Sequence, residues 1–188
     1  MIKLLHWFQT NYPEHKKALL ACHHNFDEND TNPYHIEGDC WSHTMMVCKI
    51  AQLKGYDRVV KVSALLHDIG KPQSRKINPG NKHVQFFGHE ELSATMAEPL
   101  VADLLAREML SLDEADEVLE LIRLHDFLYK HSEQEIIEKF TGRYAFLKNL
   151  IALRECDDFG RFSEGMGKSD LDVENILEKI SMSALCSD

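Results

Sequence analysis

Apolar residues recur every three or four positions along most of this chain, which is the spacing of one face of an α-helix. Stripes with this spacing run through six stretches, namely Met46–Ala51, Val59–Leu66, His89–Leu100, Ala115–Ile122, Leu147–Arg154 and Leu171–Ile180. The alternation of apolar and polar residues that is typical of a β-strand is not sustained over any useful length. The pattern therefore predicts an all-α protein in which the helices pack as a bundle.

Local start and stop signals agree with these helices. Ser111–Glu114 and Ser132–Glu135 both have the capping-box pattern, in which a Ser and the Glu three residues later cap the start of a helix. Gly70 and Pro72 follow the second stripe and are typical of a helix end. Pro99 lies inside the third stripe, where we expect it to kink or split the helix because proline donates no backbone hydrogen bond.

Length and composition predict one globular domain over residues 1–188. Of the 188 residues, 44% are hydrophobic and 28% are charged, which is ordinary for a chain that buries a proper core. No linker or internal repeat divides the chain.

Three features indicate a cytoplasmic protein. No apolar run approaches the roughly 20 residues that are needed to span a bilayer, so we expect no membrane association. The first residues show neither a long apolar core nor a small-residue cleavage site, so we expect no secretory signal. The five cysteines are odd in number and contain no Cys-x-x-Cys pair, which indicates reduced thiols rather than disulfides or a zinc ribbon.

The net charge of −10 argues against a protein that coats long nucleic acid, because such binding depends on many contacts between cations and phosphates. The negative net charge is still compatible with a small phosphorylated substrate. A divalent metal and a few local cations can outweigh a distant acidic surface, since salt screens charges over about 10 Å.

The doublet His67-Asp68, which closes an apolar helical run, carries the candidate chemistry. Burying an imidazole and a carboxylate is costly without a partner, and a divalent cation suits both groups. Further candidate ligands lie at the inward ends or faces of other predicted helices: His43, His89, His125 and Asp157. Asp158 is an alternative to Asp157.

Imidazoles and carboxylates together favour one or two divalent ions such as Mn, Co, Ni, Fe or Zn, with Mg as a further option. Such an ion can lower the pKa of a water molecule and polarise a phosphoryl oxygen. The order of the candidates along the chain therefore points to a metallohydrolase.

The motifs in this order resemble the HD-domain phosphohydrolase superfamily, in particular the HD domain of bacterial CCA-adding tRNA nucleotidyltransferases. The resemblance is carried by Trp41–Val47, Leu66–Pro72, Phe87–Ala94 and Cys156–Arg161, together with His125. It extends over a motif core at about residues 37–161, with further helices at both ends. It implies a single HD domain with an all-α bundle fold.

The resemblance implies roles for the candidate ligands. His43, His67, Asp68 and Asp157 match the ligands of a first metal. His89 and His125 match the additional ligands of dinuclear members, in which Asp68 bridges the two ions. The implied activity is hydrolysis of a phosphoester in a nucleotide or similar small substrate by metal-activated water, of the 2′,3′-cyclic phosphodiesterase, nucleotidase or phosphatase type.

Two cations follow the ligand motifs directly and are expected near the substrate phosphate. Lys71 would act as a point charge, and Arg161 suits bidentate contact with phosphate. Asp68 would also orient the attacking water, so Asp68 and Lys71 are the expected catalytic residues. His35 and Glu37 precede the first ligand and could reach the substrate, but we favour the interpretation that they form a plain loop.

The remaining histidines lie outside the motifs and are expected at the surface: His6, His15, His23, His24, His83 and His131. Two other functions stay open, namely a di-iron oxygenase that uses the same ligands and a non-catalytic nucleotide-binding module.

Overall fold

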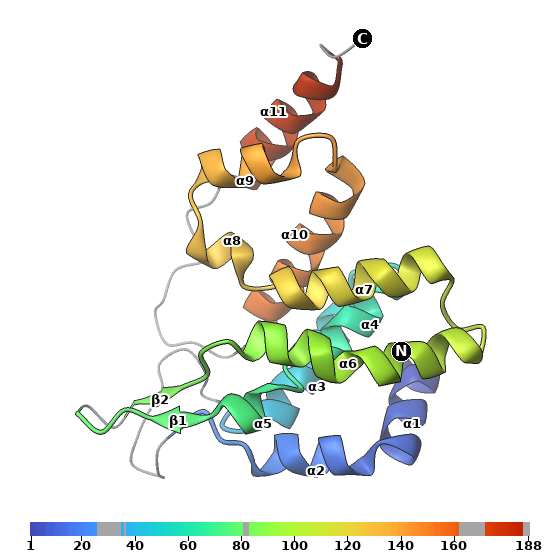
Figure 1. The fold of residues 1–188 in the computed structure, drawn as a ribbon, viewed down its shortest axis with the longest axis vertical. Helices are drawn as coiled ribbons and strands as arrows, with labels where there is room; N and C mark the ends of the chain where they lie inside the picture. Colours follow the sequence, from blue (N-terminus) through green and yellow to red (C-terminus); the bar gives the residue numbers. More distant parts are fainter. Residues whose placement is uncertain (26–34, 36, 81–82, 162–171, 186–188) are drawn as a thin grey trace.

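The computed structural model describes residues 1–25, 35, 37–80, 83–161 and 172–185, with side chains as far as residue 181. The elements in chain order are α1 (Ile2–Asn11), α2 (Pro13–Ala21), α3 (Cys40–Leu53), α4 (Arg58–Leu66), α5 (Lys71–Ser74), β1 (Lys76–Ile77), β2 (Val84–Gln85), α6 (His89–Ala106), α7 (Leu112–Leu124), α8 (Phe127–Lys130), α9 (Glu133–Phe140), α10 (Tyr144–Phe159) and α11 (Val173–Leu185). The all-α HD-type fold is confirmed (Figure 1).

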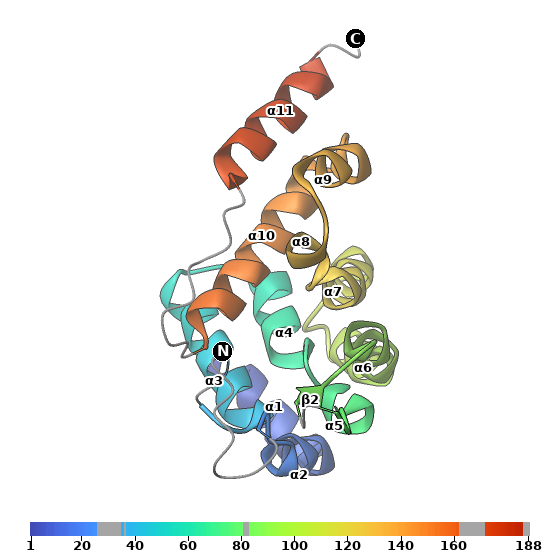
Figure 2. The same cartoon turned by 90° about the vertical axis from the view of Figure 1, so that its left-hand side faces the viewer.

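Helix α4 lies at the centre of the bundle and contacts α3, α6, α7 and α10 (Figures 1 and 2). Its residues from Val59 to Leu66 are buried except for Lys61, so the helix is covered on nearly every side. A helix that is apolar around most of its circumference is stable only inside a core. The end of α4, where the chain reaches His67, consequently lies deep in the protein.

The outer helices extend this core at both ends. On the N-terminal side α1 and α2 pack against each other, and α2 also packs on α3 and α5. There the ring of Phe8 stacks on Trp41, with centroids 5.9 Å apart. At the other end α11 packs against α9 and α10 (Figure 2) and buries Ile176 and Ile180. The buried apolar residues form one cluster from Leu4 to Ile180.

The local signals in the sequence have mixed outcomes. Both predicted capping boxes form, at Ser111 and at Ser132. Pro99 does not split its helix: α6 continues unbroken through this residue to Ala106. Pro99 is exposed, so water can hydrate the backbone carbonyl that loses its partner. The predicted start of the last helix at Leu171 lies outside the described residues.

A short antiparallel hairpin follows α5. Strands β1 and β2 pair through Lys76 with Gln85 and Ile77 with Val84. Two-residue strands leave no alternation that a sequence pattern could show. Among the helices that the structure describes, none is both long and apolar enough to cross a membrane.

Gly70 marks a close approach between the end of the central helix and the start of α6. Its backbone N–H donates to Ser93 Oγ at 2.9 Å. A Cβ at position 70 would lie 2.6 Å from Ser93 N and 2.9 Å from the backbone oxygen of His89. This space admits only glycine without displacing α6.

We therefore expect Gly70→Ala to destabilise the protein by about 1–3 kcal/mol through overpacking. Gly80→Ala is the matched control, since a Cβ there meets only the flexible side-chain oxygen of Asn78 at 3.3 Å. Urea unfolding followed by circular dichroism measures both changes. Equal stability of the two variants would contradict the predicted close packing.

Candidate metal centre

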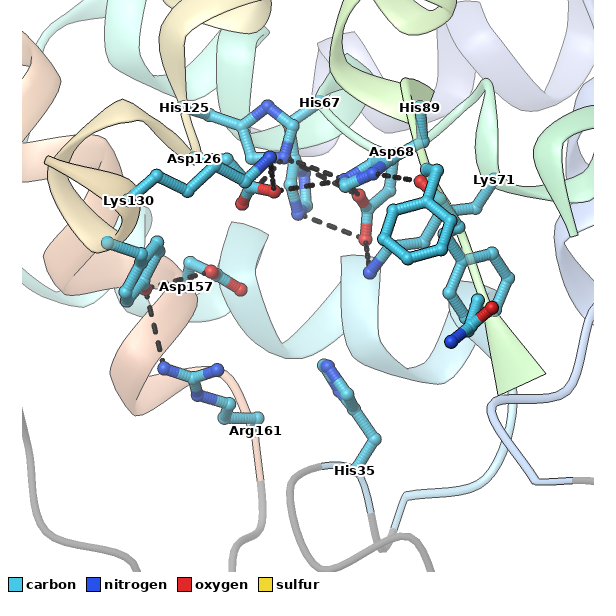
Figure 3. Close-up of a pocket in the computed structure, with 14 residues that line it drawn as sticks. His35, His67, Asp68, Lys71, His89, His125, Asp126, Lys130, Asp157 and Arg161 are labelled. Carbon is cyan, nitrogen blue, oxygen red and sulfur yellow. Dashed lines mark hydrogen bonds and ion pairs between the residues drawn. The ribbon is translucent and has the colours of Figure 1, made fainter. Parts of the chain in front are cut away.

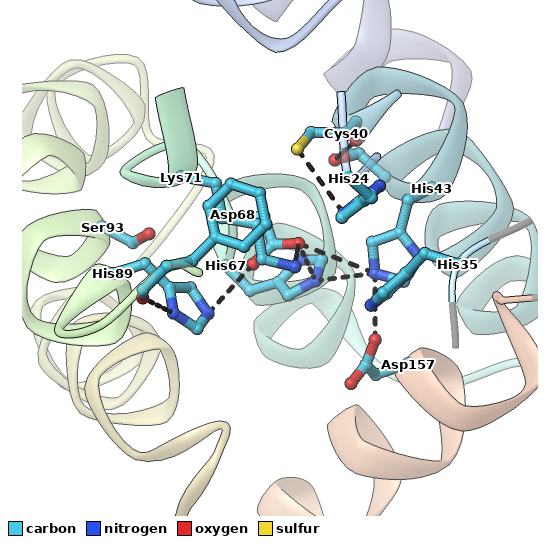
Figure 4. Close-up of polar contacts among 12 residues, drawn as sticks. His24, His35, Cys40, His43, His67, Asp68, Lys71, His89, Ser93 and Asp157 are labelled. Atoms are coloured by element: carbon cyan, nitrogen blue, oxygen red, sulfur yellow. Dashed lines mark hydrogen bonds and ion pairs between the residues drawn. The ribbon is translucent and has the colours of Figure 1, made fainter. Parts of the chain in front are cut away.

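The structure brings all six candidate ligands together around the end of α4 (Figures 3 and 4). His67 caps α4, and Asp68 follows it; each is 1% exposed. The other four arrive on separate helices, at the start of α3, the start of α6, the end of α7 and the last turn of α10: His43, His89, His125 and Asp157.

The first group of ligand atoms lies between α3, α4 and α10. His43 Nε2 is 2.9 Å from Asp157 Oδ1, 3.4 Å from His67 Nε2 and 3.6 Å from Asp68 Oδ2. His67 Nε2 is 3.3 Å from the same oxygen of Asp68. Four side chains thus present one atom each to a single point.

The second group uses the other oxygen of the same carboxylate. His89 Nε2 is 3.1 Å from His125 Nε2. The distances from these two nitrogens to Asp68 Oδ1 are 3.4 and 3.8 Å, respectively. Asp68 therefore lies between the groups, with Oδ2 facing one and Oδ1 facing the other.

Hydrogen bonds at Nδ1 of the histidine rings determine whether Nε2 can bind a metal. His67, His89 and His125 each donate Nδ1–H to the carbonyl three residues earlier, at 3.1, 2.8 and 2.7 Å. Each neutral ring then carries a lone pair at Nε2. In the His89–His125 pair these lone pairs face each other at 3.1 Å, an arrangement that requires a proton or a cation between them.

The donor set fits divalent cations. Two atoms that each lie about 2.1 Å from one ion are about 3.0–3.4 Å apart in octahedral or tetrahedral geometry, and most of the distances above fall in or near this range. Both oxygens of Asp68 are buried and accept no well-aligned hydrogen bond from the described residues. Imidazoles with carboxylates suit Mn, Fe, Co, Ni or Zn.

The charges of the groups agree with this fit. Burial would raise the pKa of Asp68, but His67 and Lys71 lower it well below its ordinary value. Burial would likewise raise the pKa of Asp157, yet His43 lowers it well below the usual range. Two carboxylates therefore stay ionised inside the protein and attract cations.

The histidines divide according to their neighbours. Burial alone would lower the pKa of His43, but the carboxylates of Asp157 and Glu37 raise it to about 9. Burial lowers the pKa of His125, which therefore stays neutral. A neutral imidazole is a ready ligand, whereas His43 would exchange its proton for the metal.

The structure separates the two adjacent carboxylates at the end of α10. Asp157 faces His43, as described above. Asp158 turns away, forms an ion pair with Arg161 and lies 3.6 Å from Arg154 Nε. Asp158 Oδ1 also accepts a hydrogen bond from Tyr129 Oη at 2.9 Å. Of the two, only Asp157 is in place as a ligand.

A pocket of about 430 Å³ opens over the two groups (Figure 3). Its wall includes both cations that the sequence singles out, Lys71 and Arg161. Lys71 Nζ is 2.7 Å from Asp68 Oδ2. Arg161 is held by Asp158 and by Tyr129, whose hydroxyl lies 3.4 Å from Arg161 Nη2. The pocket therefore joins a buried donor set to cations that could contact an anion.

The segment before α3 differs from what the sequence favours. His24, expected at the surface, is 1% exposed and stacks on His35 with centroids 4.0 Å apart. His35 lines the pocket, which agrees with the alternative of substrate contact and not with a plain loop, and the side chain of Glu37 is 2% exposed. The segments meet because His23 pairs with Asp39 in an antiparallel bridge, which helical periodicity cannot reveal.

The sequence interpretation also missed three residues that line the pocket beyond α7: Asp126, Tyr129 and Lys130. Asp126 Oδ1 is 3.6 Å from His125 Nε2, and Asp126 directly follows that ligand in the sequence. Its position directly after a predicted ligand could have identified Asp126 as a residue of the site. Tyr129 and Lys130 lie on the short helix α8. With only four residues, α8 shows no apolar periodicity from which its buried face could be predicted.

Comparison with known proteins identifies related sequences. The chain is 28% identical over 158 residues to a "Multifunctional CCA protein" of Methylobacillus flagellatus. The aligned residues are 84% of this chain and 35% of that protein. It is 29% identical over 144 residues to a protein of the same name from Burkholderia pseudomallei, covering 77% and 31%. The chain thus spans about a third of the length of these curated relatives.

The profile of the HD domain family matches residues 40–145. This segment is more than half of the chain and contains five of the six candidate ligands; Asp157 follows it. Members of this family are generally metal-dependent hydrolases. On this match the chain belongs to the HD domain family.

Proposed function

We propose that this protein is a metal-dependent phosphohydrolase that cleaves a phosphoester of a nucleotide or a similar small substrate. One observation supports this most strongly. Asp68 lies between two groups of histidines that present their lone pairs inward, at the base of a pocket whose wall carries Lys71 and Arg161. In this proposal residues 1–188 act as one HD domain in the cytoplasm.

The two groups divide the proposed metal ligands. His43, His67 and Asp157 would hold one ion together with Asp68, and His89 and His125 would hold a second ion through the other oxygen of Asp68. A bound divalent cation would act as a Lewis acid towards the phosphoryl oxygen and would lower the pKa of the attacking water.

The protein's own cations are placed to receive the substrate. Burial would lower the pKa of Lys71, but Asp68 and other neighbouring groups raise it, so the ammonium group stays charged. Lys71 thereby orients Asp68 and presents a point charge to the pocket. Asp158 and Tyr129 hold the Arg161 guanidinium through Nη2, which leaves further N–H groups for a phosphate oxygen.

The size and charge of the site favour a small anionic substrate. A pocket of about 430 Å³ accommodates one small molecule. Lys71, Lys130 and Arg161 line it beside the carboxylates of Asp68, Asp126 and Asp157. Divalent cations bound to these carboxylates would leave the basic side chains for a phosphate group, which a neutral substrate of an oxygenase would not need. A 2′,3′-cyclic phosphodiester or a nucleoside monophosphate has this size and charge.

Metal removal tests the proposal directly. Protein stripped with a chelator should lose hydrolysis of 2′,3′-cyclic nucleotides and phosphomonoesters, because the bound cation would supply the Lewis acid and the activated water. Adding back Mn, Co, Ni, Zn or Mg one at a time should restore activity and raise the melting temperature. Full activity without metal would exclude the proposal, and O₂ consumption by an iron-loaded sample would favour the oxygenase.

Asp68→Asn tests the shared carboxylate. We expect kcat/KM to fall at least about 100-fold, because both proposed ions lose a charged ligand. Asp116→Asn is the matched control, since Asp116 is exposed on α7 and outside the pocket. Phosphate release and metal content per chain measure the effect. Retention of activity and metal by Asp68→Asn would remove the shared carboxylate from the mechanism.

Arg161→Ala tests substrate contact. The loss of one charge-assisted hydrogen bond, about 1.5–3 kcal/mol, predicts a rise in KM of about 10–150-fold with metal content unchanged. Arg143→Ala is the control, because Arg143 pairs with Glu120 outside the pocket. Steady-state kinetics separate KM from kcat. An unchanged KM would mean that Arg161 only neutralises Asp158.

A further inference from the structure

His43 is held differently from the other three candidate histidine ligands. Those three donate Nδ1–H to the carbonyl three residues before them. For His43 that residue is Cys40, whose carbonyl already accepts the hydroxyl of Thr44 at 2.8 Å. The Nδ1 of His43 instead lies 3.1 Å from Glu37 Oε1.

Glu37 is shared between this ring and the pocket wall. The same Oε1 accepts a hydrogen bond from His35 Nδ1 at 2.7 Å. The rings of His35 and His43 meet edge to face, with centroids 4.9 Å apart (Figure 4). The Glu37 side chain is 2% exposed, so its charge is compensated by imidazole groups in a place that water hardly reaches.

We propose that Glu37 is a positioning residue, which orients His43 towards the metal and His35 along the pocket through one carboxylate oxygen. This inference rests on the proposed metal-dependent function. Among the described residues, His43 Nδ1 is buried and has no well-aligned acceptor. The carboxylate of Glu37, 3.1 Å away, is therefore the group that would keep a proton on Nδ1 when a metal takes Nε2. A carboxylate behind a ligand histidine also makes the ring a stronger donor to a metal.

Glu90 provides a contrast within the same site. Its Oε2 lies 3.3 Å from His89 Nδ1, close to the distance between Glu37 and His43. The His89 nitrogen already donates to the carbonyl of Phe86 at 2.8 Å. Glu90 is therefore redundant for the orientation of His89, whereas Glu37 has no backbone substitute.

Metal affinity tests this difference without any substrate. Metal-stripped variants are titrated with Mn²⁺ or Co²⁺ in competition with a chromophoric chelator. We expect Glu37→Gln to weaken the tightest site about 10–100-fold, and Glu90→Gln to change it less than about twofold. His35→Ala should keep the affinity within about threefold, because Glu37 still faces His43, but should raise the substrate KM.

Folding of the variants is checked separately. Circular dichroism and melting of the metal-free proteins show whether a change in affinity reflects lost structure. If Glu37→Gln fails to fold, Glu37→Asp retains the charge and withdraws the carboxylate, and the same weakening is expected. At saturating metal Glu37→Gln should recover most of its kcat, which a residue in contact with the substrate would not do.

The outcomes separate this inference from the proposed function. Wild-type affinity in Glu37→Gln, or equal weakening in Glu37→Gln and Glu90→Gln, would overturn the role of Glu37 and leave the hydrolase intact. A wild-type protein that binds metal but cleaves no phosphoester would overturn the proposed function. In that case weaker binding by Glu37→Gln alone would still support the positioning role.

Discussion

The architecture depends on the burial of one carboxylate, that of Asp68, at the end of the central helix. It is 1% exposed, and its two oxygens face different groups of imidazoles. A charge in this position is tolerable only if cationic or polarisable groups surround it. The helices around α4 supply such groups, since α3, α6 and α7 each direct one imidazole to this carboxylate.

The helix ends explain how these side chains are held. The last carbonyls of an α-helix have no partner within the helix, and His67 and His125 use such carbonyls at the ends of α4 and α7. His43 lies instead in the first turns of α3, where the nearby carbonyl is occupied. For His43 the carboxylate of Glu37 takes the place that a backbone carbonyl has for the other three histidines.

The sequence predicted what depends on local pattern. Helical periodicity and capping indicated α3, α4, α6, α7, α9, α10 and α11, but not the short or N-terminal elements. The motif order selected the six candidate ligands. The burial of His24 and Glu37 before α3 could not be predicted in this way. It results from a bridge between His23 and Asp39, which no periodic pattern encodes. The choice between Asp157 and Asp158 likewise depends on tertiary partners, because the Arg161 and Arg154 side chains attract Asp158, whereas His43 faces Asp157.

The ion pairs formed by the basic side chains of the pocket affect how metal and phosphate binding depend on each other. Each Lys or Arg that lines the pocket in the described part of the chain already has a carboxylate partner: Lys71 has Asp68, Arg161 has Asp158, and Lys130 has Glu90 and Asp126. Without a metal these pairs leave little net positive charge for a phosphate, on a chain whose net charge is −10. A divalent ion that draws Asp68 to itself would release Lys71 towards the substrate. Metal and phosphate should therefore bind with positive coupling, each raising the affinity for the other by the same factor.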